Sequence, residues 1–244
     1  SGERGIFNRE SAKKQAAKNG RRDVEHDFGC NPCSEIILRP YQFCNLSEVV
    51  ARAGDTEQSL ATKVGLATIL GTFQSTLTDF KYLRKVWQKN TEEERLLGVS
   101  LTGIMDNAML SGNSATLGKN IGATLELLRE VAVQTNKGMA KKLGIPQSTA
   151  ITCVKPSGTV SQLVDSASGI HARHNPHYIR TVRGDNKDPL TQFLISEGIP
   201  AEPDVMKPDS TTVFSFPMKS PNAAVTRTEM TAIEQLDLWL LYQR

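Results

Sequence analysis

Apolar side chains recur every three or four positions in several parts of the chain, and this spacing predicts amphipathic helices. The longest predicted helix covers 121–143 and is followed by Gly144 and Pro146, two residue types that terminate helices. Its expected buried stripe consists of Leu125, Leu128, Ala132, Thr135 and Met139. Another helix is predicted to begin after Asp55 as the N-cap and to run to about Thr72. Its inward residues are expected to be Leu60, Val64, Ala67 and Leu70.

Shorter helices are predicted from capping and helix-breaking residues. They cover 9–19, 79–89, the residues from Val160 onward, 191–197 and a segment that begins at Thr226. This last segment opens with the capping-box pattern Thr226-x-x-Glu229. Its inward side chains are expected to be Met230, Ile233, Leu236 and Leu240.

Apolar and β-branched stretches between the helices predict strands. They are 97–104, 149–154, 177–183 and 211–216, and a short extended piece is expected at 36–38. Because strands and helices alternate, the sequence predicts an α/β fold with parallel strand pairing. Nothing in the pattern marks a second domain, so residues 1–244 are expected to form a single partial domain.

Composition excludes several classes of protein. The chain is 39% hydrophobic and 23% charged, with a net charge of +3 from 29 basic and 26 acidic residues. This small excess does not favour a duplex-DNA-binding protein, which needs a basic stripe. The one basic cluster is expected to be a solvated helix face and consists of Lys13, Lys14, Lys18, Arg21 and Arg22. No apolar run approaches the roughly 20 residues of a membrane helix, so no membrane association is expected.

The ends of the chain indicate a piece of a longer protein. It begins without methionine, its first Met being Met105, and it stops at Arg244 within a predicted helix. No signal peptide opens it. We therefore expect an internal segment, truncated at both ends, of a cytoplasmic protein.

The densest chemical signal is Cys30-Asn31-Pro32-Cys33-Ser34-Glu35, with Cys44 eleven positions after Cys33. In an extended loop, side chains at alternate positions point the same way, so Asn31, Cys33 and Glu35 are expected to converge on one small ligand. They offer an amide, a reactive sulfur and a carboxylate that can move a proton. Catalysis is one interpretation of this trio.

Other interpretations of the cysteines stay open on spacing alone. Cys30-x-x-Cys33 is half of a zinc site, but no second pair lies at ligand spacing. It is also the spacing of thioredoxin-type redox pairs, which usually start a helix after a strand. Four cysteines are too few for a disulfide scaffold and suit a reducing compartment, where inert buried thiols are also common.

This loop resembles the central cysteine loop of class I and class II ribonucleotide reductases. The resemblance rests on residues 31–35 (NPCSE) and on the following 41–46 (YQFCNL). It implies that the chain holds part of a ten-stranded α/β barrel, through the middle of which the cysteine loop passes. The implied activity is the reduction of ribonucleotides to 2′-deoxyribonucleotides.

The resemblance also implies a role for each matching residue. Cys33 would become a thiyl radical that removes the ribose 3′-hydrogen. Glu35 would be the base on the 3′-hydroxyl, and Asn31 would hydrogen-bond to the sugar. Cys44 would be one of two cysteines that reduce the 2′ position and end as a disulfide, its partner lying outside this chain.

Two later stretches agree with this resemblance. Residues 96–103 (LLGVSLTG) resemble the glycine-containing barrel strand after the loop, and 155–161 (KPSGTVS) resemble the substrate-phosphate loop. Backbone N–H groups at a helix start bind phosphate, and a glycine lets the backbone approach closely. The expected phosphate contacts are Ser157, Gly158, Thr159 and Val160. By itself a PSGT loop is a weak signal.

Residues 168–174 (SGIHARH) and 177–183 (HYIRTVR) look most like the adenosylcobalamin-dependent class II ribonucleoside-triphosphate reductases. The opening GERGI does so too, although Arg4 stands where a proline is expected. The implied cofactor is adenosylcobalamin, and the implied substrate is a ribonucleoside di- or triphosphate.

Some candidate ligands have no implied role. Cys30 and Cys153 match no family function and are expected to be structural. His171, His174 and His177 are spaced by three, but the strand that follows them favours loop histidines, and no metal site is expected.

Several parts of the implied machine are not in this sequence. The partner of Cys44 and the allosteric region lie upstream in the family, and the cysteine pair that re-reduces the site, served by a thioredoxin-like reductant, lies downstream. We expect the chain alone to give no turnover. The alternatives are a class I reductase, a glycyl-radical reductase, and a non-enzymatic nucleotide-binding or thiol-redox module that uses Cys30 and Cys33. Glu35 and the Cys44 spacing argue against the glycyl-radical class, which typically uses formate.

Overall fold

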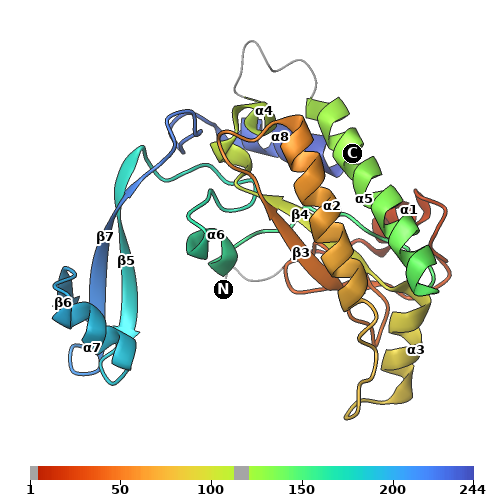
Figure 1. Cartoon of the computed structure of the whole chain (residues 1–244), viewed down its shortest axis with the longest axis horizontal. Helices are drawn as coiled ribbons and strands as arrows, with labels where there is room; N and C mark the ends of the chain where they lie inside the picture. Colours follow the sequence, from red (N-terminus) through yellow and green to blue (C-terminus); the bar gives the residue numbers. More distant parts are fainter. Residues whose placement is uncertain (1–4, 113–120) are drawn as a thin grey trace.

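Helices and strands alternate along most of the chain, which is the α/β class that the sequence predicts (Figure 1). The computed structural model describes residues 5–112 and 121–244. The helices are α1 (Arg9–Ala17), α2 (Glu57–Gln74), α3 (Lys85–Glu94), the 3-10 helix η1 (Ile104–Asp106), α4 (Ala108–Ser111), α5 (Ile121–Leu143), α6 (Thr159–Leu163), α7 (Pro189–Ser196) and α8 (Ala232–Gln243). The strands are β1 (Gly29–Cys30), β2 (Ile37–Leu38), β3 (Asn45–Val50), β4 (Leu97–Thr102), β5 (His177–Asp185), β6 (Ala201–Pro203) and β7 (Thr211–Lys219).

Parallel pairing forms the centre of the main body. β3 and β4 pair from Asn45 opposite Leu97 to Val50 opposite Thr102. On the other edge of β4, residues 150–153 run parallel through one bridge, Val99 to Thr152. The predicted strand 149–154 is therefore an extended segment with a single bridge, because the chain soon turns away from β4 toward the next loop.

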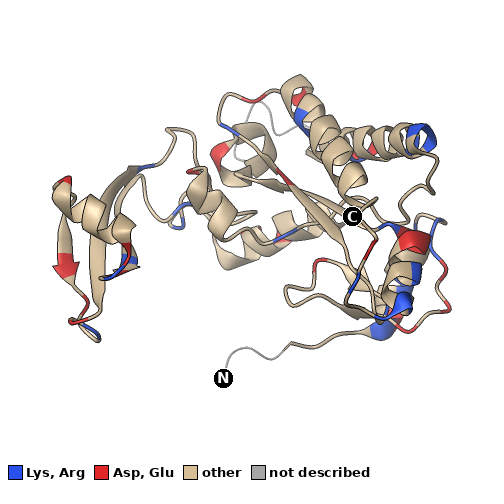
Figure 2. Ribbon diagram, turned by 60° about the horizontal axis from the view of Figure 1, so that its bottom comes forward, with Lys and Arg blue, Asp and Glu red and all other residues tan. Residues whose placement is uncertain are grey.

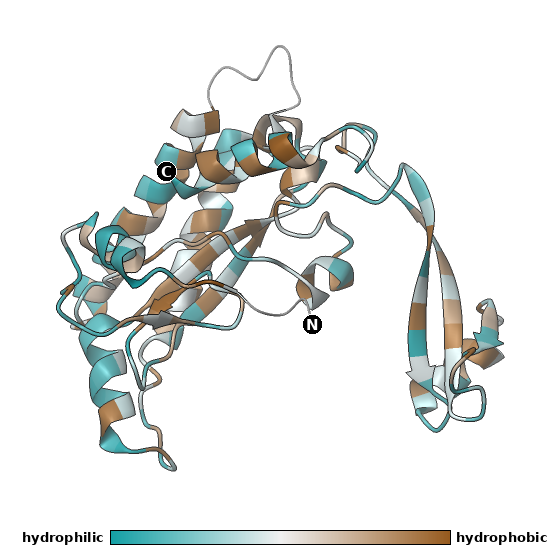
Figure 3. Ribbon diagram, turned by 180° about the vertical axis from the view of Figure 1, so that it is seen from behind, coloured by the Kyte–Doolittle hydropathy of each residue, from teal (hydrophilic) through white to brown (hydrophobic). Residues whose placement is uncertain are grey.

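Helices α2 and α5 pack together, and α2 covers β3 and β4 (Figure 1). Leu60, Val64 and Ala67 of α2 are buried as predicted, whereas Leu70 is exposed. Hydrophobic positions concentrate in the central strands and along the helix sides that face them (Figure 3).

The bounds of α5 are confirmed, but its buried stripe differs from the predicted one. Leu128 and Ala132 are buried, and the stripe continues in steps of four through Asn136 and Ala140 instead of Thr135 and Met139. Asn136 is accepted in the core because its amide is fully used. It donates to Thr72 Oγ1 and Ser148 Oγ, both at 3.0 Å, and accepts from the Ser148 N–H at 3.0 Å.

Two helix starts differ from the prediction near the beginning of the chain. The N-cap of α2 is Thr56, which forms a capping box with Ser59, while Asp55 binds Lys63 and Ser59 Oγ. The helix predicted over 79–89 begins only at Lys85. Residues 78–84 form turns instead, in which the Phe80 ring packs 5.0 Å from that of Phe43.

The last helix also begins later than predicted. Thr226 and Glu229 do hydrogen-bond, but the chain there pairs with Arg173 through a parallel bridge, so it cannot start a helix. α8 begins after Thr231, which forms its own capping box with Glu234. Its one buried residue is Leu238. The predicted inward residues Ile233, Leu236 and Leu240 are exposed, and Met230 packs partly against the core.

A second sheet is antiparallel, in the order β5-β7-β6, and parallel pairing was the wrong prediction for this part. The connection between β6 and β7 is too short for a crossover, which takes a dozen or more residues. With α7, this sheet extends away from the parallel strands at the left of Figure 1.

Basic and acidic positions are interspersed along the same helices in the part of the chain that the structure describes (Figure 2). Within residues 5–112 and 121–244, no helix combines the length and apolar character that crossing a membrane requires.

Candidate active site

Cys33 lies at the tip of a tight hairpin turn between β1 and β2, not in the extended loop that was predicted. Asn31 closes this turn. Its backbone N–H donates to the Ile36 carbonyl at 3.3 Å, and its side-chain Oδ1 accepts from the Ile36 N–H at 3.0 Å. Ser34 has a φ of 63°, in the left-handed region, and this completes the reversal. The turn leaves the Cys33 side chain exposed.

Arg22 links the hairpin to α3. It is buried, so the prediction that it lies on a solvated helix face is wrong. Its guanidinium is buried and binds both Glu94 oxygens, at 2.8 and 2.9 Å. It also donates to the Ile37 carbonyl of β2 at 2.8 Å and lies 4.7 Å from the centre of the Phe28 ring. A buried fork-to-fork pair of this kind fixes orientation as well as distance. The base of the hairpin is therefore fixed to α3.

The Glu35 carboxylate is buried beneath the turn, with 0% of its side chain exposed. Its Oε1 accepts a hydrogen bond from Lys155 Nζ at 2.8 Å, whereas Oε2 is buried without a partner among the described residues. Burial disfavours the charged form, but hydrogen bonds from Lys155, from its own backbone and from Asn31, with the charge of Lys155, outweigh it. They lower the pKa of Glu35, so the group is ionised at neutral pH.

Two more cysteines lie near this ion pair. Burial and then the negative charge of Glu35 raise the pKa of the Cys44 thiol. Burial and then Glu35 raise the pKa of Cys153 to about 12, against the opposing charge of Lys155. Cys153, predicted to be structural, therefore borders the candidate site. All four cysteines are free, and Cys30 Sγ lies 3.5 Å from Ser34 Oγ.

The predicted phosphate loop lies directly after Lys155, where the chain passes into α6. Ser157 is buried, and its hydroxyl donates to Glu48 Oε2 of β3 at 3.0 Å. At Gly158, by contrast, no atom lies within 4 Å of the position that a Cβ would take. Thr159 is the first residue of α6. Gly169 packs against the back of this loop with φ +55°; a Cβ there would lie 3.1 Å from the Lys155 carbonyl oxygen. Only glycine fits this close approach without strain.

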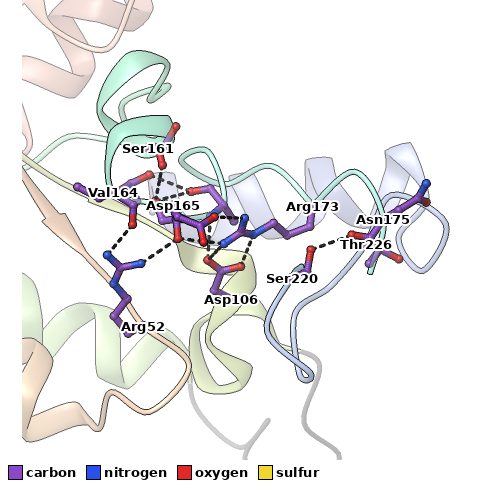
Figure 4. Close-up of polar contacts among 12 residues, drawn as sticks. Arg52, Asp106, Ser161, Val164, Asp165, Arg173, Asn175, Ser220 and Thr226 are labelled. Atoms are coloured by element: carbon purple, nitrogen blue, oxygen red, sulfur yellow. Dashed lines mark hydrogen bonds and ion pairs between the residues drawn. The ribbon is translucent and has the colours of Figure 1, made fainter. Parts of the chain in front are cut away.

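A buried charge network holds the chain that leaves α6 (Figure 4). The Arg173 guanidinium binds both oxygens of buried Asp106 at 2.8 Å and reaches Asp165 Oδ1 at 3.0 Å. Arg52 donates to the carbonyls of Val164 and Asp165 at 2.6 and 2.8 Å. The two arginines therefore fix the end of α6 to the body of the protein.

A cavity of about 1150 Å³ opens beside the cysteine turn and Lys155. Its wall on this side includes Cys33, Glu35, Cys153, Lys155 and His171. His171 Nδ1 contacts the Ser168 carbonyl at 3.1 Å, and the His174 ring packs against Tyr178. Among the described residues, no cluster of three or more His, Cys, Asp or Glu side chains is arranged to hold a metal ion.

Comparison with known proteins relates the whole chain to one group of enzymes. The adenosylcobalamin-dependent ribonucleoside-triphosphate reductase of Lactobacillus delbrueckii subsp. bulgaricus is 30% identical over 91% of this chain. The enzyme of the same name from Euglena gracilis is 29% identical over 93%. Over most of its length the chain is thus similar to part of these adenosylcobalamin-dependent reductases. It spans 33% of the length of the first of these reductases and 30% of the second.

Solved structures show the same fold. A crystal structure of a B12-dependent, class II ribonucleotide reductase superposes with a TM-score of 0.72, at 23% identity, over 92% of this chain and 34% of that one. The α subunit of a class Id reductase from Actinobacillus ureae gives a TM-score of 0.52 at 17% identity, over 79% of this chain and 39% of that one. No protein-family model matches the chain.

The structure thus brings Cys33 and Glu35 to the wall of one cavity, and Cys44 close enough to Glu35 to feel its charge. The predicted phosphate contacts Ser157, Gly158, Thr159 and Val160 do not line this cavity, which the chain borders only as far as Lys155 and Pro156. Residues 2–4 of the opening that resembles class II reductases lie outside the described residues. Two residues at the site had no predicted role. In the sequence, Lys155 is recognisable only as a basic residue directly before the predicted phosphate loop. Glu48 is recognisable only as an acidic residue in a strand that was not predicted.

Proposed function

We propose that this chain forms the substrate-binding and radical centre of an adenosylcobalamin-dependent ribonucleotide reductase. The observation that carries the proposal is the pairing of an exposed Cys33 with a buried, ionised Glu35 that has one oxygen without a protein partner. Ribonucleotide reduction needs both a thiol that can reach the sugar and a base that can hold the 3′-hydroxyl. The 23–30% identity to reductases supports this activity over a purely structural use of the loop.

The roles of the turn residues follow from their positions. The Cys33 sulfur would remove the 3′-hydrogen as a thiyl radical, becoming a thiol and leaving the unpaired electron on the sugar. Glu35 Oε2 would accept the 3′-hydroxyl proton, since Oε1 is already bound by Lys155. A base in hydrogen-bond reach contributes a factor of about 10²–10⁴. The Asn31 Oδ1 atom accepts from the Ile36 N–H, so a hydrogen bond from Asn31 to the sugar would come from its amino group, which also interacts with Glu35.

Reduction at the 2′ position would use Cys44. Two thiols give up two electrons and two protons, the 2′-hydroxyl leaves as water, and the thiols become a disulfide. Burial and Glu35 raise the pKa of Cys44, which keeps it a protonated thiol that can supply hydrogen. Its partner would be a cysteine outside this chain, and a thioredoxin-like reductant would restore the pair.

Substrate phosphates would bind at Ser157, Gly158, Thr159 and Val160. The open space at Gly158 and the N–H groups at the start of α6 suit an anion. Lys155 adds a positive charge directly before the loop. A ribonucleoside di- or triphosphate would thus extend from this loop to the cysteine turn.

The residues around Cys33 fit the expected cofactor in one testable respect: Cys33 is exposed and lines a cavity of about 1150 Å³, which has room for a bulky group. Cys33, Lys155 and His171 would form the wall against it. When bound, adenosylcobalamin supplies the radical by homolysis of its cobalt–carbon bond. The chain's own part is to hold Cys33 at the tip of a rigid turn.

The parallel strands would belong to a larger assembly. We infer that β3, β4 and the extended segment 150–153 are part of the ten-stranded barrel of the reductases, with the cysteine turn inside it. Residues 1–244 would be one part of that catalytic domain. The TM-score of 0.72 supports this placement.

The test uses a protein that joins this chain to the upstream and downstream segments that the reductase relatives have. Deoxynucleotide formation is measured with and without adenosylcobalamin. We expect cofactor-dependent turnover that Cys33→Ala abolishes and Cys30→Ala retains. Equal loss in both variants, without cofactor dependence, would instead support a Cys30–Cys33 thiol-redox module. The 244-residue chain alone is expected to give no product.

A further inference from the structure

Lys155 is the residue that joins the candidate base to the candidate phosphate loop. Its Nζ binds Glu35 Oε1 at 2.8 Å, across 120 positions of sequence. Its backbone leads directly into Pro156 and Ser157, and Gly169 packs so closely on this backbone that a Cβ there would lie 3.1 Å from the Lys155 carbonyl oxygen and 3.3 Å from the Ser157 nitrogen. One side chain thus reaches the cysteine turn while its main chain forms the start of the loop.

We infer that Lys155 is a positioning residue that holds the Glu35 carboxylate in place and couples it to the phosphate loop. This inference rests on the proposed function and deepens it. Lys155 occupies one carboxylate oxygen, and the other, Oε2, has no partner among the described residues and is left for a hydroxyl donor. A movement of the loop on binding phosphate would be transmitted through Lys155 to the base.

Burial is the reason that Lys155 matters. Because 0% of the Glu35 side chain is exposed, solvent screens the ion pair between Glu35 and Lys155 only weakly. An unpaired buried carboxylate takes up a proton or rotates toward another donor. The other titratable groups whose charges reach this pair are the thiols of Cys33, Cys44 and Cys153, and none of them carries a positive charge. Among these groups Lys155 alone supplies a positive charge to ionised Glu35, which hydrogen bonds from Asn31 and from its own backbone also stabilise.

The first test measures the Glu35 carboxylate directly in the chain, without any activity. With ¹³C-labelled glutamate, the carboxyl resonance that is lost in Glu35→Gln is followed by NMR as a function of pH. In Lys155→Met the titration midpoint should rise by about one unit or more, because an opposite charge at this distance shifts a carboxyl by roughly 1–3 units. Lys155→Arg, which keeps the charge, should restore most of the wild-type midpoint.

A matched control separates this effect from general destabilisation. Lys63 also forms an ion pair with a largely buried carboxylate, that of Asp55, but far from the cysteine turn in sequence. Lys63→Met should leave the Glu35 midpoint unchanged. If Lys155→Met does not fold, the wild-type chain still decides, because the ¹⁵Nζ resonance of Lys155 should then follow the Glu35 titration. An unchanged Glu35 midpoint in Lys155→Met, or a Lys155 resonance that ignores Glu35, would overturn the inference.

The second test uses the completed enzyme and its pH profile. The acid limb of kcat/KM should move to higher pH in Lys155→Met, because a base of higher pKa is protonated over a wider range. Lys155→Arg should return the limb toward its wild-type position. An active wild type whose Lys155→Met variant keeps the same acid limb would refute the positioning role alone. A wild type without cofactor-dependent turnover would refute the proposed function while leaving the NMR result standing.

Discussion

Gly98 lies in β4 beneath the cysteine turn, and replacing it with alanine should disturb three segments of the site at once. A Cβ at this position would lie 2.5 Å from Leu46 Cδ2, 3.0 Å from Ile36 Cδ1 and 3.2 Å from Cys153 Sγ. The first distance is shorter than real carbon–carbon contacts allow, so Leu46 at least must move. Ile36 follows Glu35 in the chain, so the base is expected to move with it.

The size of the effect follows from two opposing terms. An extra methyl group in a packed core costs about 1–3 kcal/mol. The reduced freedom of the unfolded chain returns about 0.4–1 kcal/mol when glycine becomes alanine. We therefore expect Gly98→Ala to lower the free energy of unfolding by about 1–2 kcal/mol. Gly138 in α5 is the matched control, since nothing lies within 4 Å of its Cβ position. Gly138→Ala should raise stability by about 0.5–1 kcal/mol.

Equilibrium unfolding in urea measures both variants against wild type. The slope m should stay the same, so that a shift in midpoint reports stability alone. Opposite signs for the two alanine substitutions are the expected result. A Gly98→Ala chain as stable as Gly138→Ala would mean that the three neighbouring side chains repack freely. The close contacts beneath the cysteine turn would then not position it.

Further predictions concern the hairpin anchor and the thiols. Arg22→Met leaves Glu94 buried without its partner and should lower the free energy of unfolding, measured in urea, by about 3–5 kcal/mol. Replacing both residues with Met should recover much of this loss. An Arg22→Met variant as stable as wild type would refute the role of Arg22 in fixing the hairpin. Iodoacetamide at pH 8 should label Cys33 first, because it is exposed. Cys153 should be labelled last, since burial and Glu35 raise its pKa to about 12 and leave roughly one thiolate in ten thousand. Mass spectrometry of timed digests checks this order, and equal rates at the two cysteines would contradict it.

Local patterns predicted the long elements well, because their burial follows helix or strand periodicity. α5 has the predicted bounds, and the apolar run at 97–104 became β4. β3 was missed because its centre, Ser47 and Glu48, is polar and does not read as a buried strand. Glu48 is tolerated there because it accepts the Ser157 hydroxyl, a partner 109 positions away. No local rule contains such a contact.

The candidate site was predictable in its residues but not in its geometry. The motif selected Cys33, Glu35 and the loop at Ser157 as candidates, and these remain predictions. Alternation along an extended chain was the wrong reason for expecting Asn31 and Glu35 to meet. A turn closed by Asn31 does this instead, with Ser34 in the left-handed region. The capping-box pattern at Thr226 likewise did not mark the start of a helix. The chain there pairs with Arg173 in a parallel bridge, a long-range contact that the local pattern does not contain.

The hairpin also distinguishes Cys33 from Cys30, which spacing alone could not. Cys30 belongs to β1, is paired opposite Ile37 and is partly buried, with its sulfur 3.5 Å from Ser34 Oγ. Cys33 stands three residues further on at the exposed tip and lines the cavity. In a thiol-redox pair the two sulfurs must be able to bond to each other and one of them must be able to attack an external disulfide. CxxC pairs of this kind usually lie at the start of a helix. In this chain the same spacing spans a strand end and a turn, and Cys33 is the cysteine of the two that lines the cavity together with Glu35 and Lys155. The proposed radical role therefore falls on Cys33, which is exposed and shares the cavity wall with the candidate base, and not on Cys30, which does not line the cavity.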